Sequence, residues 1–322
     1  MKGLRERLEE HQVVIYFATV AAAAGMAFFL PRMASLDAAI NPALAFMLFV
    51  TFLQVPLADL GHAFTRFRFL GALLIVNFLA VPLLVVGLGQ FLPNDPLVRL
   101  GFLLVLLTPC IDYVVTFSQI GKANYRLLLA ATPVLLLVQM LLLPVYLRVL
   151  LGSQATDLIQ IGPFVHAFIW LIAVPLALAV MVQMAAKRSA TGQRVAGGLG
   201  LCPVPATAVV LFVVVGAVVP QLHAAIDAAI RVIPLYAAFA VVAPALGWMI
   251  GRWFRLDPSA GRAVAFSAGT RNSLVVLPLG LAVPGAIPIL PAVIVTQTMV
   301  ELIGELVYMR IMPRLGGKDA NA

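Results

Sequence analysis

Four ionisable side chains lie inside stretches of the chain that are otherwise apolar, and one of the two cysteines lies among them. They are Asp112, Arg271, Glu301, Glu305 and Cys110. A carboxyl group can carry a proton, a guanidinium is a permanent positive charge, and a thiolate is a soft ligand for metals and metalloids. Because an unpartnered ionisable group at bilayer depth costs at least about 2.5–3.5 kcal/mol, we expect these residues to have functions.

The charged residues allow several roles. Asp112 could be a substrate ligand, a proton carrier or a salt-bridge partner of Arg271. Arg271 could bind an anionic substrate, replace a coupling cation, or neutralise Asp112 and Glu301. Glu301 and Glu305 are four residues apart, so they share one face of a helix. Three acids against one arginine predict at least one carboxyl that carries a proton, and Glu305 could instead have a structural partner near a helix end.

Two polar islands interrupt the apolar pattern, at residues 107–115 and 267–276, and each contains Pro or Gly and ends in Val-Val. In the second island, Asn272 and Ser273 could contact a substrate or cap freed main-chain groups. In the first, Cys110 could be a soft ligand or a small buried apolar side chain. Broken helices with free main-chain groups are typical of substrate sites in secondary transporters.

The elements that position these residues are predicted to be transmembrane helices. The 322 residues are 63% hydrophobic and 11% charged, and the mean hydropathy is +1.07. This composition excludes a soluble globular domain and indicates a polytopic, all-α membrane protein. Apolar runs predict ten spans, near residues 13–30, 40–57, 69–91, 97–118, 126–149, 163–186, 199–219, 232–251, 262–282 and 287–310.

The distribution of basic residues predicts the topology. Sixteen of the 21 lysines and arginines fall in the terminal segments and alternate loops on one side, against four in the opposite loops. The excess of Lys and Arg marks the cytoplasmic side, so we expect an inner (plasma) membrane protein with both termini in the cytoplasm. The net charge of +8 reflects this bias and predicts no nucleic-acid partner.

Cys110 and Arg271 are 161 residues apart, half the chain. Two halves of five spans must have opposite orientations, which predicts an inverted repeat of residues 1–160 and 161–322 with broken spans four and nine. We expect such a protein to be a secondary transporter rather than an enzyme. The alternatives are an intramembrane enzyme that uses Asp112, Glu301 and Glu305 as acid and base groups, or a channel.

No cofactor or resident metal is expected. The chain contains no P-loop, no dinucleotide fingerprint and no H-x-x-x-H cluster, which gives no support to an ATP-driven pump or a metallohydrolase. The expected partners are a small solute, protons and the bilayer, and we expect a monomer or a homodimer.

Thr108-Pro109-Cys110, followed by Val114, Ser118 and Lys122, resembles the fourth-span motif of the arsenite efflux permeases in the bile acid/arsenite transporter superfamily. Further similar segments are Asn77-Phe78-Leu79-Ala80-Val81-Pro82-Leu83-Leu84, Val55-Pro56-Leu57-Ala58 and the acid Glu301.

This resemblance implies a bile acid sodium symporter-like fold with crossed, broken spans four and nine. It further implies a core (substrate) domain from spans 3–5 and 8–10, and a panel domain from spans 1–2 and 6–7. The implied activity is export of arsenite in exchange for protons, hence arsenical resistance, with Cys110 as the contact to the metalloid and Asn77 among the binding residues.

The chain departs from this family in span nine. Leu274 occupies a position that is usually a glutamate, and Arg271 is not the usual residue. The sodium-binding positions of the bile acid branch align with Ser267 and Arg271, which argues against sodium coupling. The alternative substrate is a small organic anion that pairs with Arg271.

Overall fold

A computed structural model of the chain describes residues 2–54, 66–111, 113–152, 165–166, 169–220, 225–281, 283 and 285–316. Over these residues the chain is helical and contains no strand, and its one isolated antiparallel bridge joins Pro109 to Arg271. Asp112 lies outside the described residues. The prediction of an all-helical protein is confirmed.

The chain divides into two compact units, and each unit draws on both halves of the sequence. Unit 1 contains Met1–Val55, Ile159–Ile226 and Leu277–Ala292, and unit 2 contains Pro56–Leu158, Asp227–Val276 and Val293–Ala322.

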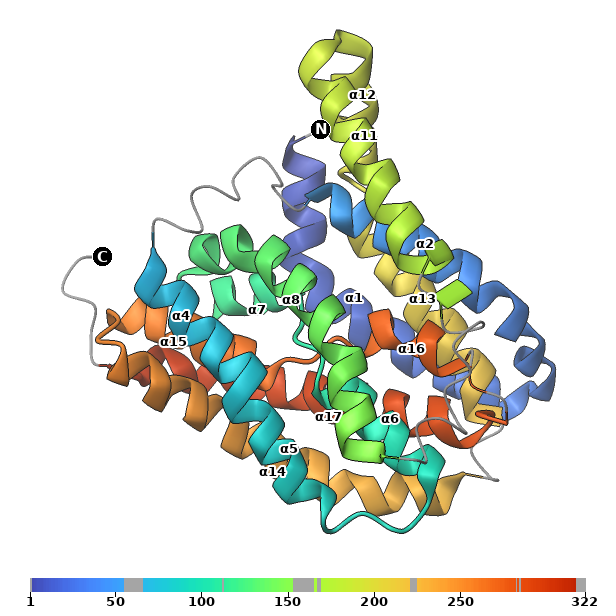
Figure 1. Cartoon of the computed structure of the whole chain (residues 1–322). Helices are drawn as coiled ribbons and strands as arrows, with labels where there is room; N and C mark the ends of the chain where they lie inside the picture. The colour runs from blue at the N-terminus through green and yellow to red at the C-terminus, as the bar shows by residue number, and fades with distance from the viewer. Residues whose placement is uncertain are drawn as a thin grey trace. The chain divides into compact units, whose positions relative to one another are not determined.

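Unit 1 is built from apolar helices that pack side by side. α13 packs against α1 and α2, and α11 packs against α2 and α12. Figure 1 shows α12 at the tip of α11. The elements are α1 (Lys2–Phe29), η1 (Pro31–Leu36), α2 (Asp37–Gln54), η4 (Ile169–Ala173), α11 (Val174–Arg188), α12 (Ala190–Leu199) and α13 (Pro203–Val218).

Unit 2 holds every described residue of the predicted site. α15 packs against α4, α7 and α8, and α6 packs against α5 and α8. The elements are α4 (Phe67–Ile75), η3 (Val76–Ala80), α5 (Val81–Gly89), α6 (Pro96–Leu106), α7 (Val114–Ile120), α8 (Tyr125–Leu151), α14 (Ile226–Trp253), α15 (Pro258–Gly269), α17 (Ile289–Ile311) and η6 (Met312–Arg314). α16 (Ser273–Leu281) begins in unit 2 and continues into unit 1, and the first four residues of α17 also belong to unit 1.

Seven of the described helical stretches are long and apolar enough to cross a membrane, or eight if α12 and α13, which meet at a 41° bend, form one span. The chain is therefore an integral multi-pass membrane protein. The helices around the two polar islands, α6 with α7 and α15 with α16, are each shorter than a full span. The count of ten spans and the inverted repeat stay predictions.

Side-chain caps begin three of the helices in unit 2. Asp95 accepts hydrogen bonds from the first-turn N–H groups of α6 at 2.9 and 3.1 Å. Asn124 caps α8 at 3.3 Å, and Asp257 caps α15 at 3.1 Å. Pro96 and Pro258 follow two of these caps as first helical residues, where a missing N–H costs nothing. Local sequence thus fixes where these helices start.

A proline shapes the third predicted span. α4 and α5 form one rod with the π-helical turn η3 between them (Figure 1). Pro82 has no N–H to donate to the carbonyl of Phe78, four residues earlier. The hydroxyl of Tyr146, on α8, donates to that carbonyl at 2.6 Å. η3 contains Asn77, so the irregular turn sets the position of this side chain.

Candidate functional site

The two polar islands are non-helical where they meet, and they bond to each other through the main chain. The N–H of Cys110 donates to the carbonyl of Thr270 at 3.1 Å, and the N–H of Asn272 donates to the carbonyl of Thr108 at 2.8 Å. These bonds join the C-terminal ends of α6 and α15, although the two segments are separated by half the sequence.

The crossing leaves carbonyl groups at both helix ends without their usual donors. In a regular α-helix each N–H donates to the carbonyl four residues earlier. Cys110 and Asn272 donate across the crossing instead, and the N–H of Arg271 donates to Glu301 Oε2 at 2.7 Å. The carbonyls that lose helical donors in this way are those of Leu106, Ala268 and Ser267.

The guanidinium of Arg271 replaces the missing donors of these three carbonyls. It donates to the carbonyl of Ser267, to that of Ala268 at 2.9 Å and to that of Leu106 at 3.4 Å. It also donates to Asn77 Oδ1 at 2.7 Å. Arg271 is fully buried. A permanent cation thus lies where the negative ends of two helices meet, which is a favourable place for positive charge.

Asn77 is oriented for this contact by its other hydrogen bonds. Its amide nitrogen donates to Ser267 Oγ at 2.9 Å and to the carbonyl of Leu73 at 3.0 Å, which leaves the amide oxygen to accept from Arg271. The ring of Phe239 lies 5.6 Å from the guanidinium carbon and adds a cation–π contact. All of the oxygens that bind the guanidinium among the described residues are neutral.

Glu301 is held by hydrogen-bond donors. Its Oε1 accepts from the hydroxyl of Tyr113 at 2.6 Å, and its Oε2 accepts from the main-chain N–H of Arg271 and from the amide of Gln297. The carboxyl therefore contacts the main chain of Arg271 rather than its guanidinium. This is a different arrangement from direct neutralisation by an ion pair.

Tyr113 links the carboxyl to the crossing. Its hydroxyl lies 2.6 Å from Glu301 Oε1 and 3.0 Å from the carbonyl of Arg271. One phenolic proton can donate to only one of these acceptors at a time. An ionised Glu301 would take this proton. A protonated Glu301 could donate to the phenolic oxygen and leave the phenol to donate to the carbonyl of Arg271.

Glu305 and Ser273 also contact polar partners. The hydroxyl of Thr270 donates to Glu305 Oε1, while Glu305 Oε2 is buried and has no hydrogen-bond partner in the described part of the chain. The hydroxyl of Thr298 donates to Ser273 Oγ at 2.7 Å. α17 thus presents polar residues to both sides of the break in span nine.

Two neighbouring donors at the break have no partner among the described residues. They are Arg271 Nε and Asn272 Nδ2, and both are buried. The Oδ1 atom of Asn272 accepts from the N–H of Val275 at 3.2 Å. In this side chain, therefore, the amide nitrogen is the atom without a hydrogen-bond partner among the described residues. Buried donors without acceptors cost free energy unless a ligand or water meets them.

The structure brings together seven of the eight site residues predicted from the sequence, and all seven are buried: Cys110, Arg271, Asn272, Ser273, Asn77, Glu301 and Glu305. The eighth, Asp112, is outside the described residues. Sequence reasoning missed the partners that hold them, namely Tyr113, Ser267, Thr270, Gln297 and Thr298. Tyr113, Ser267 and Thr270 lie inside the polar islands, and this position could have identified them as partners of the site residues. Gln297 and Thr298 precede Glu301 by one helical turn.

Within the described ranges, no group of three or more His, Cys, Asp or Glu residues could hold a metal ion. Neither cysteine forms a disulfide bond.

Broken helices around a buried charged cluster in a helical membrane protein are typical of the class of solute transporters. The profile of the Sodium Bile acid symporter family matches residues 41–225, which is more than half of the chain. The chain therefore belongs to this family and is a membrane transporter of solutes. No curated protein matches it. The matched segment includes Cys110 but ends before Arg271 and Glu301.

Proposed function

We propose that the protein is a secondary active exporter of arsenite that works by proton antiport and alternating access. The observation that carries the proposal is the place of Cys110, which lies buried at the crossing of the two broken helices. A thiol in this position offers a soft sulfur ligand to a trivalent metalloid. The resemblance of Thr108-Pro109-Cys110 to the arsenite efflux motif supports the same substrate.

The buried guanidinium supports a coupling ion other than sodium. A coupling cation would need oxygen ligands at the meeting point of the helix ends, and the oxygens there already bind Arg271. Of the three roles that the sequence leaves open for Arg271, these contacts favour the replacement of a coupling cation.

The carboxyls on α17 are the proposed proton carriers. Glu301 contacts the main chain of the crossing, and Tyr113 offers a second hydrogen-bond arrangement for its protonated form. Glu305, with one oxygen unpartnered in the described structure, is a second candidate. Asp112 is proposed as a further substrate or proton ligand on the sequence alone.

In this proposal unit 2 is the core domain that carries the site, and unit 1 is the panel domain. The division of the chain into two units supports this assignment, since each collects elements from both halves of the sequence. Because the site residues are buried, access from either side requires a conformational change.

Arsenite resistance of an efflux-deficient bacterial host tests the substrate. We expect expression of the wild type to confer resistance, Cys110→Ser and Glu301→Gln to abolish it, and the matched control Cys202→Ser to retain it. Arsenite uptake into everted vesicles should follow an imposed pH gradient and ignore a sodium gradient. Absence of resistance with the wild type, or resistance that survives Cys110→Ser, would contradict the proposal.

The second candidate is transport of a small organic anion. The unpartnered donors Arg271 Nε and Asn272 Nδ2, on consecutive residues, favour it, because buried donors of this kind are suited to the oxygens of a carboxylate or sulfate. Anions that raise the melting temperature of the wild type but not of Arg271→Gln, together with no effect of arsenite, would select this candidate over the first.

A further inference from the structure

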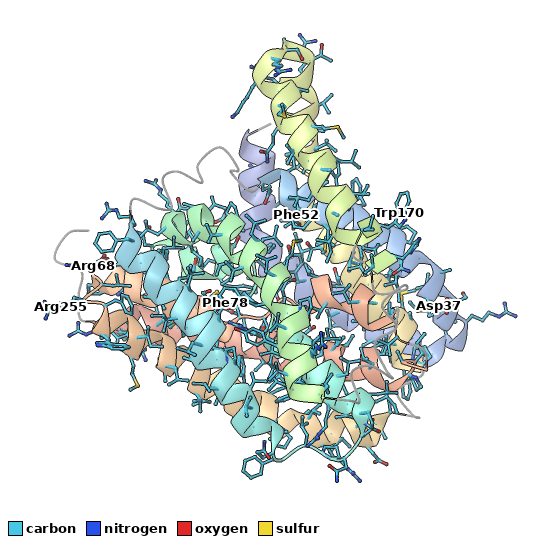
Figure 2. The ribbon with its side chains drawn as sticks, viewed as in Figure 1. Asp37, Phe52, Arg68, Phe78, Trp170 and Arg255 are labelled. Carbon is cyan, nitrogen blue, oxygen red and sulfur yellow. The ribbon has the colours of Figure 1, made fainter. Side chains whose placement is uncertain are left out.

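A basic pocket lies at one end of unit 2, away from the crossing. It is formed by the start of α4, the connection between α14 and α15, the first turn of α15 and one residue of α8. Its volume is about 450 Å³, within the range of small-molecule sites. Arg66, Arg68 and Arg255 line it, with Phe67 and Asp257 among the other lining residues. Figure 2 shows Arg68 and Arg255 at the same end of the unit.

The guanidinium groups of the three arginines form no hydrogen bond or ion pair with any residue that the structure describes, although their main chains do form hydrogen bonds. Asp257 lines the same pocket, but its carboxyl caps α15 and accepts from the hydroxyl of Ser259 at 2.6 Å. Asp257 offsets one of the three positive charges, so the described lining of the pocket keeps a net positive charge. An occupant with two or more acceptor oxygens and negative charge would complete it.

The surroundings of the pocket point to the membrane surface. Phe67 is 72% exposed and Trp253 is 75% exposed, and both lie at ends of long apolar helical stretches. Aromatic side chains beside arginines at the ends of spans are typical of the headgroup region of a bilayer. We propose that this pocket binds the phosphate headgroup of an anionic phospholipid, with its acyl chains against Phe67 and Trp253.

Lipid binding to the full-length protein in detergent tests the proposal. The probes are dioleoyl phosphatidylglycerol, dioleoyl phosphatidylcholine and glycerol 3-phosphate, with dissociation constants from native mass spectrometry. We expect phosphatidylglycerol to bind the wild type at least roughly tenfold more tightly than phosphatidylcholine. The triple variant Arg66→Gln/Arg68→Gln/Arg255→Gln should lose this preference.

The matched control is Arg99→Gln/Arg148→Gln/Arg231→Gln, which removes the same charge from loops predicted to lie on the opposite side of the membrane. It should bind phosphatidylglycerol as the wild type does. Two single variants, Arg68→Gln and Arg255→Gln, provide the test if the triple variant does not fold, and each should weaken binding severalfold. Unchanged binding by the pocket variants, or an equal loss in the control, overturns the proposal. Binding of glycerol 3-phosphate as tight as that of phosphatidylglycerol also overturns it, in favour of a soluble phosphate ligand.

Discussion

Arg271 stabilises the crossing because its guanidinium binds carbonyls that a broken helix cannot satisfy. Three of its acceptors are main-chain oxygens at the ends of α6 and α15, and the fourth is Asn77 Oδ1. These are hard oxygen ligands, the type that Na⁺, Ca²⁺ and Mg²⁺ prefer over nitrogen or sulfur. Removal of the guanidinium should therefore leave a buried cavity lined by four oxygens that could bind a metal cation.

Arg271→Gln tests this account. We expect the variant to lose at least about 2 kcal/mol of stability, because several buried acceptors lose their donor. Sodium chloride should raise its melting temperature relative to choline chloride at equal concentration, because Na⁺ can occupy the vacated oxygens.

Arg262→Gln is the matched control for that experiment. Arg262 is also buried, and it also donates to main-chain carbonyls, those of Lys122 at 2.9 Å and Leu315 at 3.1 Å. Its loss should lower stability without any response specific to sodium. A sodium response of equal size in both variants, or in neither, would rule out a cation site at Arg271.

Tyr113→Phe removes the hydroxyl that connects Glu301 to the carbonyl of Arg271. If this hydroxyl links the protonation of Glu301 to the crossing, the variant should still bind substrate but exchange it for protons at least about tenfold more slowly. Substrate exchange without a pH gradient, compared with pH-driven flux in proteoliposomes, measures the two separately. Tyr125→Phe, at the start of α8, is the control, and equal loss of both fluxes in Tyr113→Phe would indicate a purely structural role.

At the scale of elements, the sequence predicts where the helices break better than it predicts which residues contact the broken segments. Pro109 and Gly269 stop α6 and α15 where the polar islands predict, because these residues do not support a continuous helix. The contact between Tyr113 and Glu301 joins residues 188 positions apart. Helical periodicity states which residues share a face but not which faces meet, so this contact could not be predicted from the sequence.

The π-helical turn η3 was missed although its signal is in the sequence. Pro82 inside an apolar run predicts a kink but not a π-turn, and it does not predict that Tyr146 on α8 donates to the carbonyl of Phe78 (Figure 2 shows Phe78 on the rod formed by α4 and α5). A tertiary contact from α8 therefore accompanies the irregular turn that contains Asn77.

Tyr146→Phe should lower stability by about 1–3 kcal/mol, because the carbonyl of Phe78 loses a donor. Pro82→Ala should reduce this cost, since alanine restores an N–H that can donate to the same carbonyl. Denaturation of the two single variants and the double variant gives the coupling energy. Strictly additive effects would mean that Pro82 and Tyr146 do not share the carbonyl.

At the scale of the whole molecule, the described helices indicate how many segments could span a membrane, whereas the distribution of charge predicts on which side the termini lie. Seven helices pass the length and hydropathy test for a span, and eight do if the bent pair is one span. The short helices around the crossing fail this test individually, because each predicted span is interrupted near its middle. A count by helix length therefore cannot fix the sidedness of the termini, whereas the sixteen-to-four bias of basic residues predicts it.

Reporter fusions to the full chain and to truncated chains test whether the chain has ten spans or whether the segments around the crossing do not cross the membrane. With ten spans, alkaline phosphatase fused after Gly152 follows five spans and should be active outside the cytoplasm, whereas a fluorescent protein fused after Ala322 should be fluorescent inside. If the segments around the crossing did not cross the membrane, the fusion after Gly152 would follow four spans and would also be cytoplasmic. Since an inverted repeat requires an odd number of spans in each half, a cytoplasmic position for Gly152 would contradict both the repeat and the alternating-access mechanism built on it.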